Sequence, residues 1–478
     1  MYLNAHSYYS LRYGTLSIKD LVGKCYEKGH RAMALTDINN STGALIFVKE
    51  CFEMGIKPIV GIEFRDAAGN SLYTGIARNN KGFQELNELL TNYNLYGVAL
   101  PERLLLDNVY AVYPYASIHP DKLKAQEYIG IKPSDLSKII RDKNLKKYLM
   151  FPVLTFSGKD GYELHRQLRS IDYNTLITKL SKGQFANWDE ELYSVDELLK
   201  MYEAFPLLVE NTQRMIDDCS FEFEFRKNRN KKTFTNSPYE DRLLLEKLAW
   251  EGMKYRYGDG NPEAVKRINN ELNIIDNLGF SAYFLITWDI IQFSMAQGFY
   301  HVGRGSGANS VVAYCLKITN VCPIELDLYF ERFLNPKRKS PPDFDIDYSW
   351  KERDQVLDYI FKRYGKKNTA LLGAMSTFRD RSVLRELGKV YGLPKLEIDR
   401  LIEFPLDELN QHEISKKIYG FKTLMEDFPN LRTIHAGGVL ISEEPITAYV
   451  ALDLPPKGYP TVQFDMYISE DIGFEKFD

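Results

Sequence analysis

The sequence lacks several features that mark secreted and membrane proteins. Its 5 cysteines in 478 residues are scattered and odd in number, with no C-x-x-C pair, which argues against a disulfide framework or a structural zinc site. It contains no run of about 18 or more apolar residues, and the start of the chain has no uninterrupted apolar stretch. We therefore expect no membrane span and no signal peptide, and a reducing, cytoplasmic location.

The chain also lacks an excess of positive charge, because its formal net charge is -4. A bound polyanion would therefore have to be met by a local basic patch. Hydrophobic residues make up 44% of the chain and charged residues 26%, which is typical of a globular protein large enough for two or more domains. No internal repeat and no low-complexity tract is present.

The first 65 residues alternate between amphipathic helices that end at glycine and short buried strands. This alternation predicts a β/α repeat with parallel strands. The helices are expected at 20–30 and 44–55, and the strands at 31–39 and 56–64.

The middle of the chain mixes strand and helix patterns. We expect a strand at 147–156 and a helix at 194–205 that is capped by Ser194, with Glu197 three residues on. The polar, basic stretch 224–241 is typical of a linker, and we place a domain boundary near residue 230. A helix at 261–279 begins after Asn261, and residues 366–434 resemble short helices joined by loops.

Three aspartates alternate with apolar residues in "PDFDID" at 342–347. On a strand, Asp343, Asp345 and Asp347 would share one face while Phe344 and Ile346 enter a core. Like charges this close repel, so the pattern favours a bound cation between them. The alternative is a solvated edge or loop.

A glycine-rich turn lies upstream, in "HVGRGSGANSVVAYC". We expect a short strand, a turn from Gly303 to Gly307 and a helix from about Ala308, whose first amides would point toward an anion. It is neither a Walker P-loop nor a dinucleotide fingerprint. The alternative is an ordinary turn, but Arg304, Ser306 and Ser310 supply donors suited to phosphate.

A local basic patch of Arg332, Lys337, Arg338 and Lys339 follows in "YFERFLNPKRKSPP". The alternative is a solvated surface turn, which we favour for Lys337 and Lys339, whereas Arg332 is the better candidate for a phosphate contact. A phosphate-binding turn, a basic patch and paired carboxylates together indicate a metal-dependent phosphoryl or nucleotidyl transferase. Such enzymes use two Mg²⁺ ions about 4 Å apart.

Residues 303–365, from "GRGSGANS" through "PPDFDID" to "KRYG", resemble the palm of the C-family replicative DNA polymerases, the bacterial DNA polymerase III alpha subunits. The resemblance implies a polymerase-beta-like nucleotidyltransferase fold in which Gly305 and Ser306 hold the incoming triphosphate. It also implies that Asp345 and Asp347 bind the metals, and it assigns no role to Asp343.

The family's third aspartate lies in a K-x-D that follows a "HAGG" segment. Here "HAGG" occupies 435–438 and the chain finishes "EKFD", so the resemblance assigns the third metal ligand to Asp478 and a phosphate or primer contact to Lys476. For His435 we favour a structural role in a Gly-Gly turn over catalysis.

The first domain resembles the polymerase-and-histidinol-phosphatase (PHP) domain with which that family opens. The family's H-x-H reads "NAH" here, its T-D-H reads "TDI", and its N-D-x-H is replaced by "TFSGKD". Only His6, Asp37 and Glu63 remain of the ligand set, and isoleucine cannot coordinate a cation. We therefore expect an inactive PHP domain that serves packing or partner docking.

The resemblance thus implies an α/β multidomain fold: a distorted PHP β/α barrel, a nucleotidyltransferase palm and a small helical thumb. The expected function is template-dependent DNA synthesis by a two-metal mechanism with Mg²⁺. We expect a fragment of feeble or no polymerase activity, since the family's fingers and C-terminal domains follow the third aspartate. The expected domains are PHP at 1–230, palm at 231–365, thumb at 366–434 and the rest of the palm at 435–478.

The expected partners are primer-template DNA, deoxynucleoside triphosphates and a proofreading exonuclease subunit docked on the PHP domain. A sliding clamp and its loader are expected for the full-length protein only. Two other functions stay open. One is a PHP-type phosphoesterase or exonuclease, and the other is a non-catalytic docking module.

Overall fold

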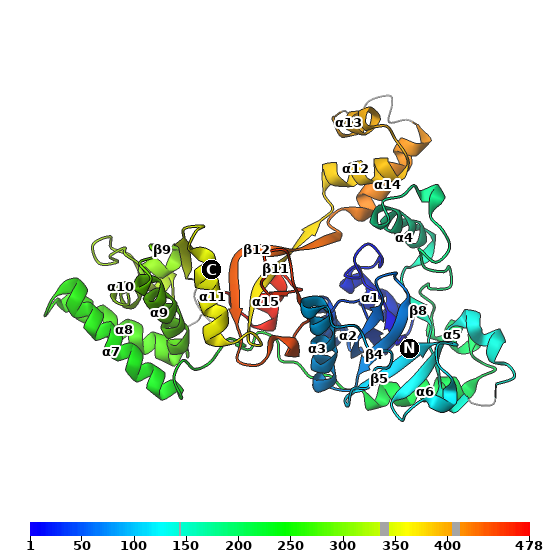
Figure 1. Ribbon diagram of the computed structural model, residues 1–478, viewed down its shortest axis with the longest axis horizontal. Coiled ribbons are helices and arrows are strands. Elements are labelled where there is room, and N and C mark those ends of the chain that lie inside the picture. Colours follow the sequence, from blue (N-terminus) through cyan, green and yellow to red (C-terminus); the bar gives the residue numbers. More distant parts are fainter. Residues whose placement is uncertain (143–144, 335–343, 404–411) are drawn as a thin grey trace. The chain divides into compact units, whose positions relative to one another are not determined.

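The structure is a computed structural model that describes residues 1–142, 145–334, 344–403 and 412–478. It divides into two compact units (Figure 1). Unit 1 contains Met1–Phe223, Ala374–Thr433 and Thr447–Asp453. Unit 2 contains Glu224–Gly373, Ile434–Ile446 and Leu454–Asp478. Asp343, Lys337, Arg338 and Lys339 lie outside the described residues.

A curled sheet forms the centre of unit 1. Six strands lie in the order β2, β3, β4, β5, β6, β7, and β4 is antiparallel to both of its neighbours, whereas the other pairs are parallel. A parallel pair, β1 and β8, continues the sheet because Tyr2, just before β1, bridges to Met33 of β2. The strands are β1 (Asn4–Ala5), β2 (Ala32–Leu35), β3 (Lys57–Arg65), β4 (Ser71–Ala77), β5 (Val109–Pro114), β6 (Glu127–Ile131), β7 (Tyr148–Met150) and β8 (Val153–Leu154).

Helices join these strands much as the sequence predicts. Helix α1 (Ile18–Glu27) precedes β2, helix α2 (Ala44–Met54) precedes β3, and β2 and β3 are parallel, so the predicted β/α repeat is confirmed. The single strand predicted at 147–156 is wrong, since β7 and β8 are separate strands with different partners. The remaining helices of residues 1–223 are α3 (Asn80–Tyr96), α4 (Gly158–Asp172), α5 (Val195–Met201) and α6 (Pro206–Asp218).

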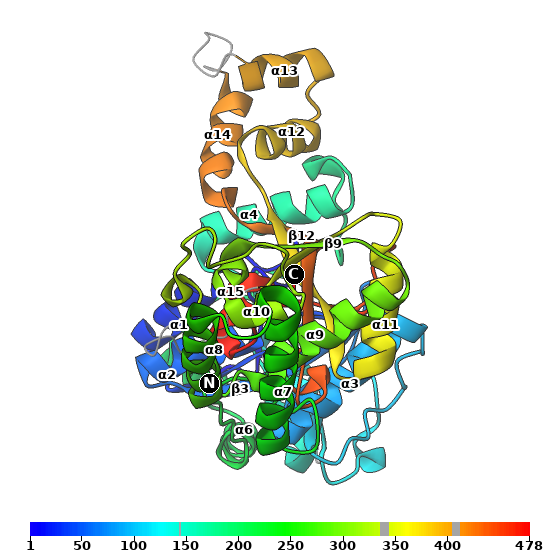
Figure 2. The ribbon, with the colours of Figure 1, turned by 90° about the vertical axis from the view of Figure 1, so that its left-hand side faces the viewer.

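A small helical group in unit 1 comes from the later part of the chain. Helices α12 (Asp380–Val390) and α14 (Glu413–Met425) pack near α4, and α13 (Lys395–Glu403) lies on the far side of α12 (Figure 2). Leu164 and Leu168 of α4 share a buried apolar cluster with Leu387 of α12 and Ile418 of α14. These helices agree with the prediction for 366–434, but that prediction missed the strands β11 (Thr369–Thr377) and β12 (Pro429–Ile441).

Unit 2 combines helices with short strands. Helix α8 (Pro262–Asn277) is confirmed, with Asn261 accepting hydrogen bonds from the amides of Glu263 and Ala264. Unit 2 contains residues 369–373 of β11, residues 434–441 of β12 and all of β14 (Thr461–Val462), and the strands are neighbours in the order β12, β11, β14. Strand β9 (His301–Arg304) pairs with β10 (Asp345–Tyr348). The other elements are α7 (Pro238–Tyr257), α9 (Ser281–Ala296), α10 (Val311–Cys315), α11 (Arg353–Tyr364) and α15 (Met466–Ile472), while β13 (Leu452–Asp453) belongs to unit 1.

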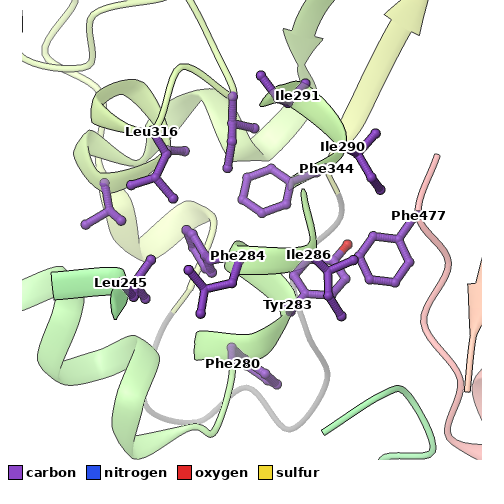
Figure 3. Close-up of a cluster of buried hydrophobic side chains, with 14 of the residues drawn as sticks. Leu245, Phe280, Tyr283, Phe284, Ile286, Ile290, Ile291, Leu316, Phe344 and Phe477 are labelled. Atoms are coloured by element: carbon purple, nitrogen blue, oxygen red, sulfur yellow. The ribbon is translucent and has the colours of Figure 1, made fainter. Parts of the chain in front are cut away.

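An apolar core holds the parts of unit 2 together. Figure 3 shows Tyr283 and Phe284 of α9 among Phe344, Phe477 and neighbouring aliphatic side chains. Tyr283 stacks on Phe344 and on Phe477, with ring centroids 5.6 Å and 4.6 Å apart. Residues more than a hundred positions apart in the chain are thereby fixed against one helix.

Within the described residues, no single helix has the length and apolar composition to cross a membrane. Helices α8 and α9 reach the required length and apolar composition only when they are taken together, and they are bent by 113° at the break between them. Most of α9 is buried in the core of unit 2, as expected of an apolar helix inside a folded domain.

Candidate active site

Two antiparallel strands, β9 and β10, place the aspartates. Asp345 lies opposite Arg304 and Asp347 lies opposite Val302. Phe344, just before β10, is 2% exposed and enters the core, whereas Asp347 is exposed, as the alternation in the sequence predicts. The strand is therefore confirmed for residues 345–348.

Asp345, Asp347 and Asp478, the three metal ligands that the resemblance implies, line one cavity of about 400 Å³ in unit 2. Asp345 and Asp347 reach it from β10, and Asp478 reaches it from the end of the chain. Arg304, Arg353 and His435 line the same cavity, and apolar side chains of α9 and α11 complete it. Carboxylates, basic side chains and apolar side chains therefore line the same cavity. This combination is typical of a site that binds a polar ligand.

Backbone contacts hold Asp478 beside β10. The amide of Ile346 donates to the backbone carbonyl oxygen of Asp478 at 2.9 Å. Phe477 and Val439 exchange backbone hydrogen bonds at 2.7 Å and 2.8 Å. The last residues therefore lie between β10 and β12, and the carboxylate of Asp478 joins those of the aspartate strand.

Each candidate carboxylate is paired with a basic side chain. The Nε of Arg304 donates to Asp347 Oδ2 at 2.6 Å, and its guanidinium also lies 3.6 Å from Asp345 Oδ2. The hydrogen bond to Asp347 raises the pKa of Arg304. Lys476 forms an ion pair with Asp478. The repulsion that three nearby carboxylates would create is thus relieved by two cations.

Two glycines leave room beside the carboxylates. A Cβ at Gly305, whose φ is +76°, would lie 2.7 Å from Asp345 Oδ2, and a Cβ at Gly437 would lie 2.5 Å from Asp478 Oδ1. Asp478 Oδ1 is buried and accepts no hydrogen bond in the described structure. A buried carboxylate oxygen without a donor, in a cavity with two further carboxylates, fits a cation.

The glycine-rich turn differs from the prediction. Residues Gly305–Asn309 form a short 3-10 helix, and α10 begins only at Val311, so the helix predicted from about Ala308 starts later. The first amides of α10 donate to Glu271 of α8 and do not point toward an open anion site. Ser310 is buried and caps α10, while Ser306 is half-buried.

The remaining predicted phosphate contacts lie in different places. Lys476 is mostly buried beside Asp478. Arg332 is exposed at the end of a short 3-10 helix and does not line the cavity. His435 lines the cavity, but its Nδ1 accepts hydrogen bonds from the amides of Gly437 and Gly438, at 3.2 Å and 3.1 Å. Burial and Lys476 lower the pKa of His435.

Sequence reasoning missed Arg353 at the start of α11. Its guanidinium lines the cavity and donates to the carbonyl oxygen of Ala436 in the "HAGG" segment. An arginine five residues beyond an acidic strand, in the first turn of an amphipathic helix, is the signal that could have indicated it.

Two of the three residues retained from the PHP ligand set, Glu63 and His6, form a closed network in unit 1. Glu63 Oε2 accepts from Asn4 at 2.8 Å and lies 2.9 Å from His6 Nε2, and Glu63 Oε1 accepts from Arg65 at 2.5 Å. His6 Nδ1 lies 3.0 Å from Thr155 Oγ1. Burial alone would raise the pKa of Glu63, but Arg65 and His6 hold it well below its usual range.

Asp37 lies apart from that network. Its carboxylate accepts hydrogen bonds from the Ser7 amide and from the hydroxyls of Ser7 and Ser10, each at 2.7 Å. Burial raises the pKa of Asp37 to about 6 despite these donors. Both oxygens of Glu63 and both oxygens of Asp37 are therefore occupied by protein donors, and this set does not fit a metal ion.

Across the described ranges, no group of three or more His, Cys, Asp or Glu side chains is arranged closely enough to hold a metal. In unit 2 the three aspartates share a cavity, where Arg304 pairs with Asp345 and Asp347 and Lys476 pairs with Asp478 Oδ2, while Asp478 Oδ1 accepts no hydrogen bond in the described structure. A cation could compete with those side chains there, whereas the Glu63 network of unit 1 is fully paired.

Comparisons with known families agree with both units. Residues 3–126 match the PHP domain model, and residues 243–478 match the model for the bacterial DNA polymerase III alpha NTPase domain. The chain belongs to the bacterial DNA polymerase III alpha family. The match over 243–478 contains Arg304, the aspartate strand and Asp478.

Relatives in this family match the whole chain. It is 30% identical to DNA polymerase III subunit alpha of Halalkalibacterium halodurans, with 100% of the chain and 48% of that protein covered. It is 28% identical to an error-prone DNA polymerase of Symbiobacterium thermophilum and to DNA polymerase III subunit alpha of Escherichia coli K12. All of the chain is covered in both cases, together with 50% and 47% of those proteins. The chain spans about half the length of the curated relatives it matches.

Proposed function

We propose that this chain is the PHP and palm part of a DNA-directed DNA polymerase, which adds deoxynucleotides to a primer on a template. The observation that carries the proposal is the convergence of Asp345, Asp347 and Asp478 on one cavity, beside the turn that begins at Gly305. The match to the polymerase domain over 243–478 supports the same reading.

The three aspartates would hold two Mg²⁺ ions. Such ions, when bound, activate the attacking hydroxyl and stabilise the leaving pyrophosphate. Arg304 and Lys476 would release their carboxylates to the cations and turn to the phosphates of the incoming nucleotide, with Gly305 and Ser306 providing backbone contacts. We add Arg353 to this set, because it lines the cavity and its guanidinium donates to the carbonyl oxygen of Ala436 rather than to a carboxylate.

Arg332 would contact phosphate from its exposed position outside the cavity. We leave Ser310 out of the proposed nucleotide contacts, because its hydroxyl donates to Glu271 at 2.8 Å and accepts from the Ala313 amide. The apolar floor of the cavity, which includes Ile290 and Val439, would keep water away from the reacting phosphate.

We propose that the PHP domain is inactive and serves packing or docking. The paired Glu63 network supports this, since His6, Asn4 and Arg65 already occupy that carboxylate. A proofreading exonuclease subunit is the proposed partner of this domain, and a clamp and loader are proposed for the full-length protein only. The location proposed is the bacterial cytoplasm, in keeping with five cysteines that are all free thiols.

The proposed domain limits are PHP at 1–230, palm at 231–365 and 435–478, and thumb at 366–434. The order of strands from β8 through β1 to β7, with β7 and β8 consecutive in the chain, supports a distorted barrel. Helices α12, α13 and α14 support a helical thumb.

Titration of the purified chain with a deoxynucleoside triphosphate and Mg²⁺ by calorimetry tests the proposal. We expect Mg²⁺-dependent binding that weakens at least tenfold in Asp345→Asn, because that variant loses a charged metal ligand. Asp259→Asn is the matched control, since the Asp259 side chain is 82% exposed in a turn.

Equal triphosphate binding by the wild type and Asp345→Asn would contradict the palm assignment. Extension of a primed template in the same samples measures polymerase activity directly. We expect that activity to be weak or absent in this chain, so binding is the deciding measurement.

A further inference from the structure

Helix α8 carries a carboxylate on its apolar face. Glu271 is 0% exposed and lies between Ile268 and Ile275, which are also buried. An unpaired carboxylate in such a place is strongly unfavourable, so its partners indicate why it is there.

Apart from Arg267 of the same helix, those partners belong to the segment that follows the glycine-rich turn. Glu271 Oε2 accepts from the Ser310 hydroxyl at 2.8 Å and from the Val312 amide at 3.0 Å, and Oε1 accepts from the Val311 amide at 3.0 Å. One turn earlier on α8, Arg267 lies 3.4 Å from Glu271 and donates to the carbonyl oxygen of Asn309 at 3.0 Å. Four consecutive residues, 309–312, are thus held by two side chains of one helix.

The contacts continue from this segment to the aspartate strand. The side-chain amide of Asn309 donates to the carbonyl oxygen of Ser306 at 2.8 Å. Gly305 lies against the Asp345 carboxylate, and a Cβ at Gly307 would lie 2.5 Å from the Phe344 ring. An unbroken series of contacts therefore joins a buried acid on α8 to both sides of the turn.

We infer that Glu271, together with Arg267, is a positioning pair that fixes the Gly305–Ser306 turn for binding a nucleotide triphosphate. The inference rests on the proposed function of the palm cavity. Glu271 does not line that cavity and would touch neither metal nor substrate. It acts by fixing residues 309–312, whose position determines where the turn meets Asp345.

The electrostatics of Glu271 are consistent with this role. Burial raises the pKa of Glu271 to about 7 in spite of its three donors and Arg267. An exposed side chain could cap α10 without burying a charge. The use of buried Glu271 instead therefore favours a fixed position of residues 309–312 over maximal stability.

Glu271→Gln tests the inference, because glutamine keeps the size of the side chain while replacing one acceptor oxygen by an amide donor. The control is Glu263→Gln, an exposed residue in the first turn of the same helix. We expect Glu271→Gln to weaken binding of Mg²⁺-deoxynucleoside triphosphate about tenfold. Binding of primer-template DNA should change less than twofold, whereas general damage to the domain would weaken both.

Hydrogen exchange followed by mass spectrometry gives a second readout. We expect faster exchange across residues 305–312 in Glu271→Gln and unchanged exchange in α7. Where Glu271→Gln does not fold, Asn309→Ala replaces it, since it removes only the hydrogen bond to Ser306. The same separation between triphosphate and DNA binding is expected for that variant.

The outcomes separate this inference from the proposed function. Failure of the wild type to bind triphosphate, or binding that is insensitive to Asp345→Asn, contradicts the proposed function. Wild-type binding that depends on Asp345 but is unaffected by Glu271→Gln or Asn309→Ala contradicts the positioning role alone.

Discussion

The ring of Tyr283 stacks on the ring of Phe477, with centroids 4.6 Å apart and an angle of 28° between the planes. Phe477 is followed by Asp478, and Phe344, which also stacks on Tyr283, is followed by Asp345. One buried aromatic side chain of α9 therefore fixes the residues that precede two of the three candidate metal ligands.

Tyr283→Leu should lower the free energy of unfolding by about 2 kcal/mol, because it removes two aromatic contacts and leaves space in the core. It should also weaken triphosphate binding, since Asp345 and Asp478 lose their common support. Urea unfolding and calorimetry measure the two effects. The control is Tyr300→Leu, whose side chain is 88% exposed, and an equal effect from both variants would argue against this role.

Gly437→Ala should weaken Mg²⁺-dependent triphosphate binding several-fold, because its Cβ would lie 2.5 Å from Asp478 Oδ1 and displace that carboxylate. The matched control is Gly420→Ala in α14, where a Cβ meets nothing within 4 Å. That control should be neutral or stabilise the protein by up to about 1 kcal/mol. Unchanged binding in Gly437→Ala would mean that Asp478 does not contribute to the site.

Arg65→Met should destabilise the protein by about 3 kcal/mol, because it leaves one oxygen of the buried Glu63 carboxylate without its cation. The double variant Glu63→Gln/Arg65→Met should recover part of this loss, since the charge is removed with its partner. Thermal unfolding with and without EDTA completes the test. Because EDTA would also remove Mg²⁺ from the proposed palm site, the comparison is made in the Asp345→Asn background. A lower melting temperature in EDTA there would indicate a metal in unit 1, contrary to the paired network.

Acid should destabilise unit 1 through His165. Burial lowers the pKa of His165 to about 4, and its ring donates to the Tyr13 carbonyl oxygen and accepts from the Ala186 amide, which requires the neutral form. Because the unfolded chain titrates near 6.5, it binds more protons than the folded chain between pH 6.5 and 4. The contribution of neutral His165 to the free energy of unfolding is therefore fully present above about pH 6.5. It falls by about 3 kcal/mol as the pH drops to 4.

Urea unfolding between pH 4 and 7 measures this effect, with His165→Gln as the variant that can keep both hydrogen bonds. The free energy of unfolding of this variant should depend less steeply on pH than that of the wild type. The difference in slope should correspond to at most one proton bound on unfolding. His119→Gln is the control, since the His119 side chain is 67% exposed. A slope in His165→Gln equal to that of the wild type would show that another group causes the acid sensitivity. His30, whose pKa burial also lowers to about 4, would be the next to test.

The sequence by itself determined those elements whose pattern is local. The cap at Asn261, the capping box of Ser194 and Glu197, and the alternation from Phe344 to Tyr348 all agree with the structure. These features depend on residues that are close together in the sequence. Capping hydrogen bonds join residues a few positions apart, and the burial of every second or every fourth side chain follows the order of apolar and polar residues.

Other features were decided only by tertiary structure. The split between β7 and β8, and the strands β11 and β12, depend on partners far away in the chain, which no local pattern contains. The carboxylate of Glu271 on α8 takes the first amides of α10, so the predicted helix from Ala308 starts later and Ser310 faces inward. Long-range packing also brings Arg353 and Asp478 to the cavity of Asp345, because stacking on Tyr283 and pairing with β12 join segments that the sequence keeps apart.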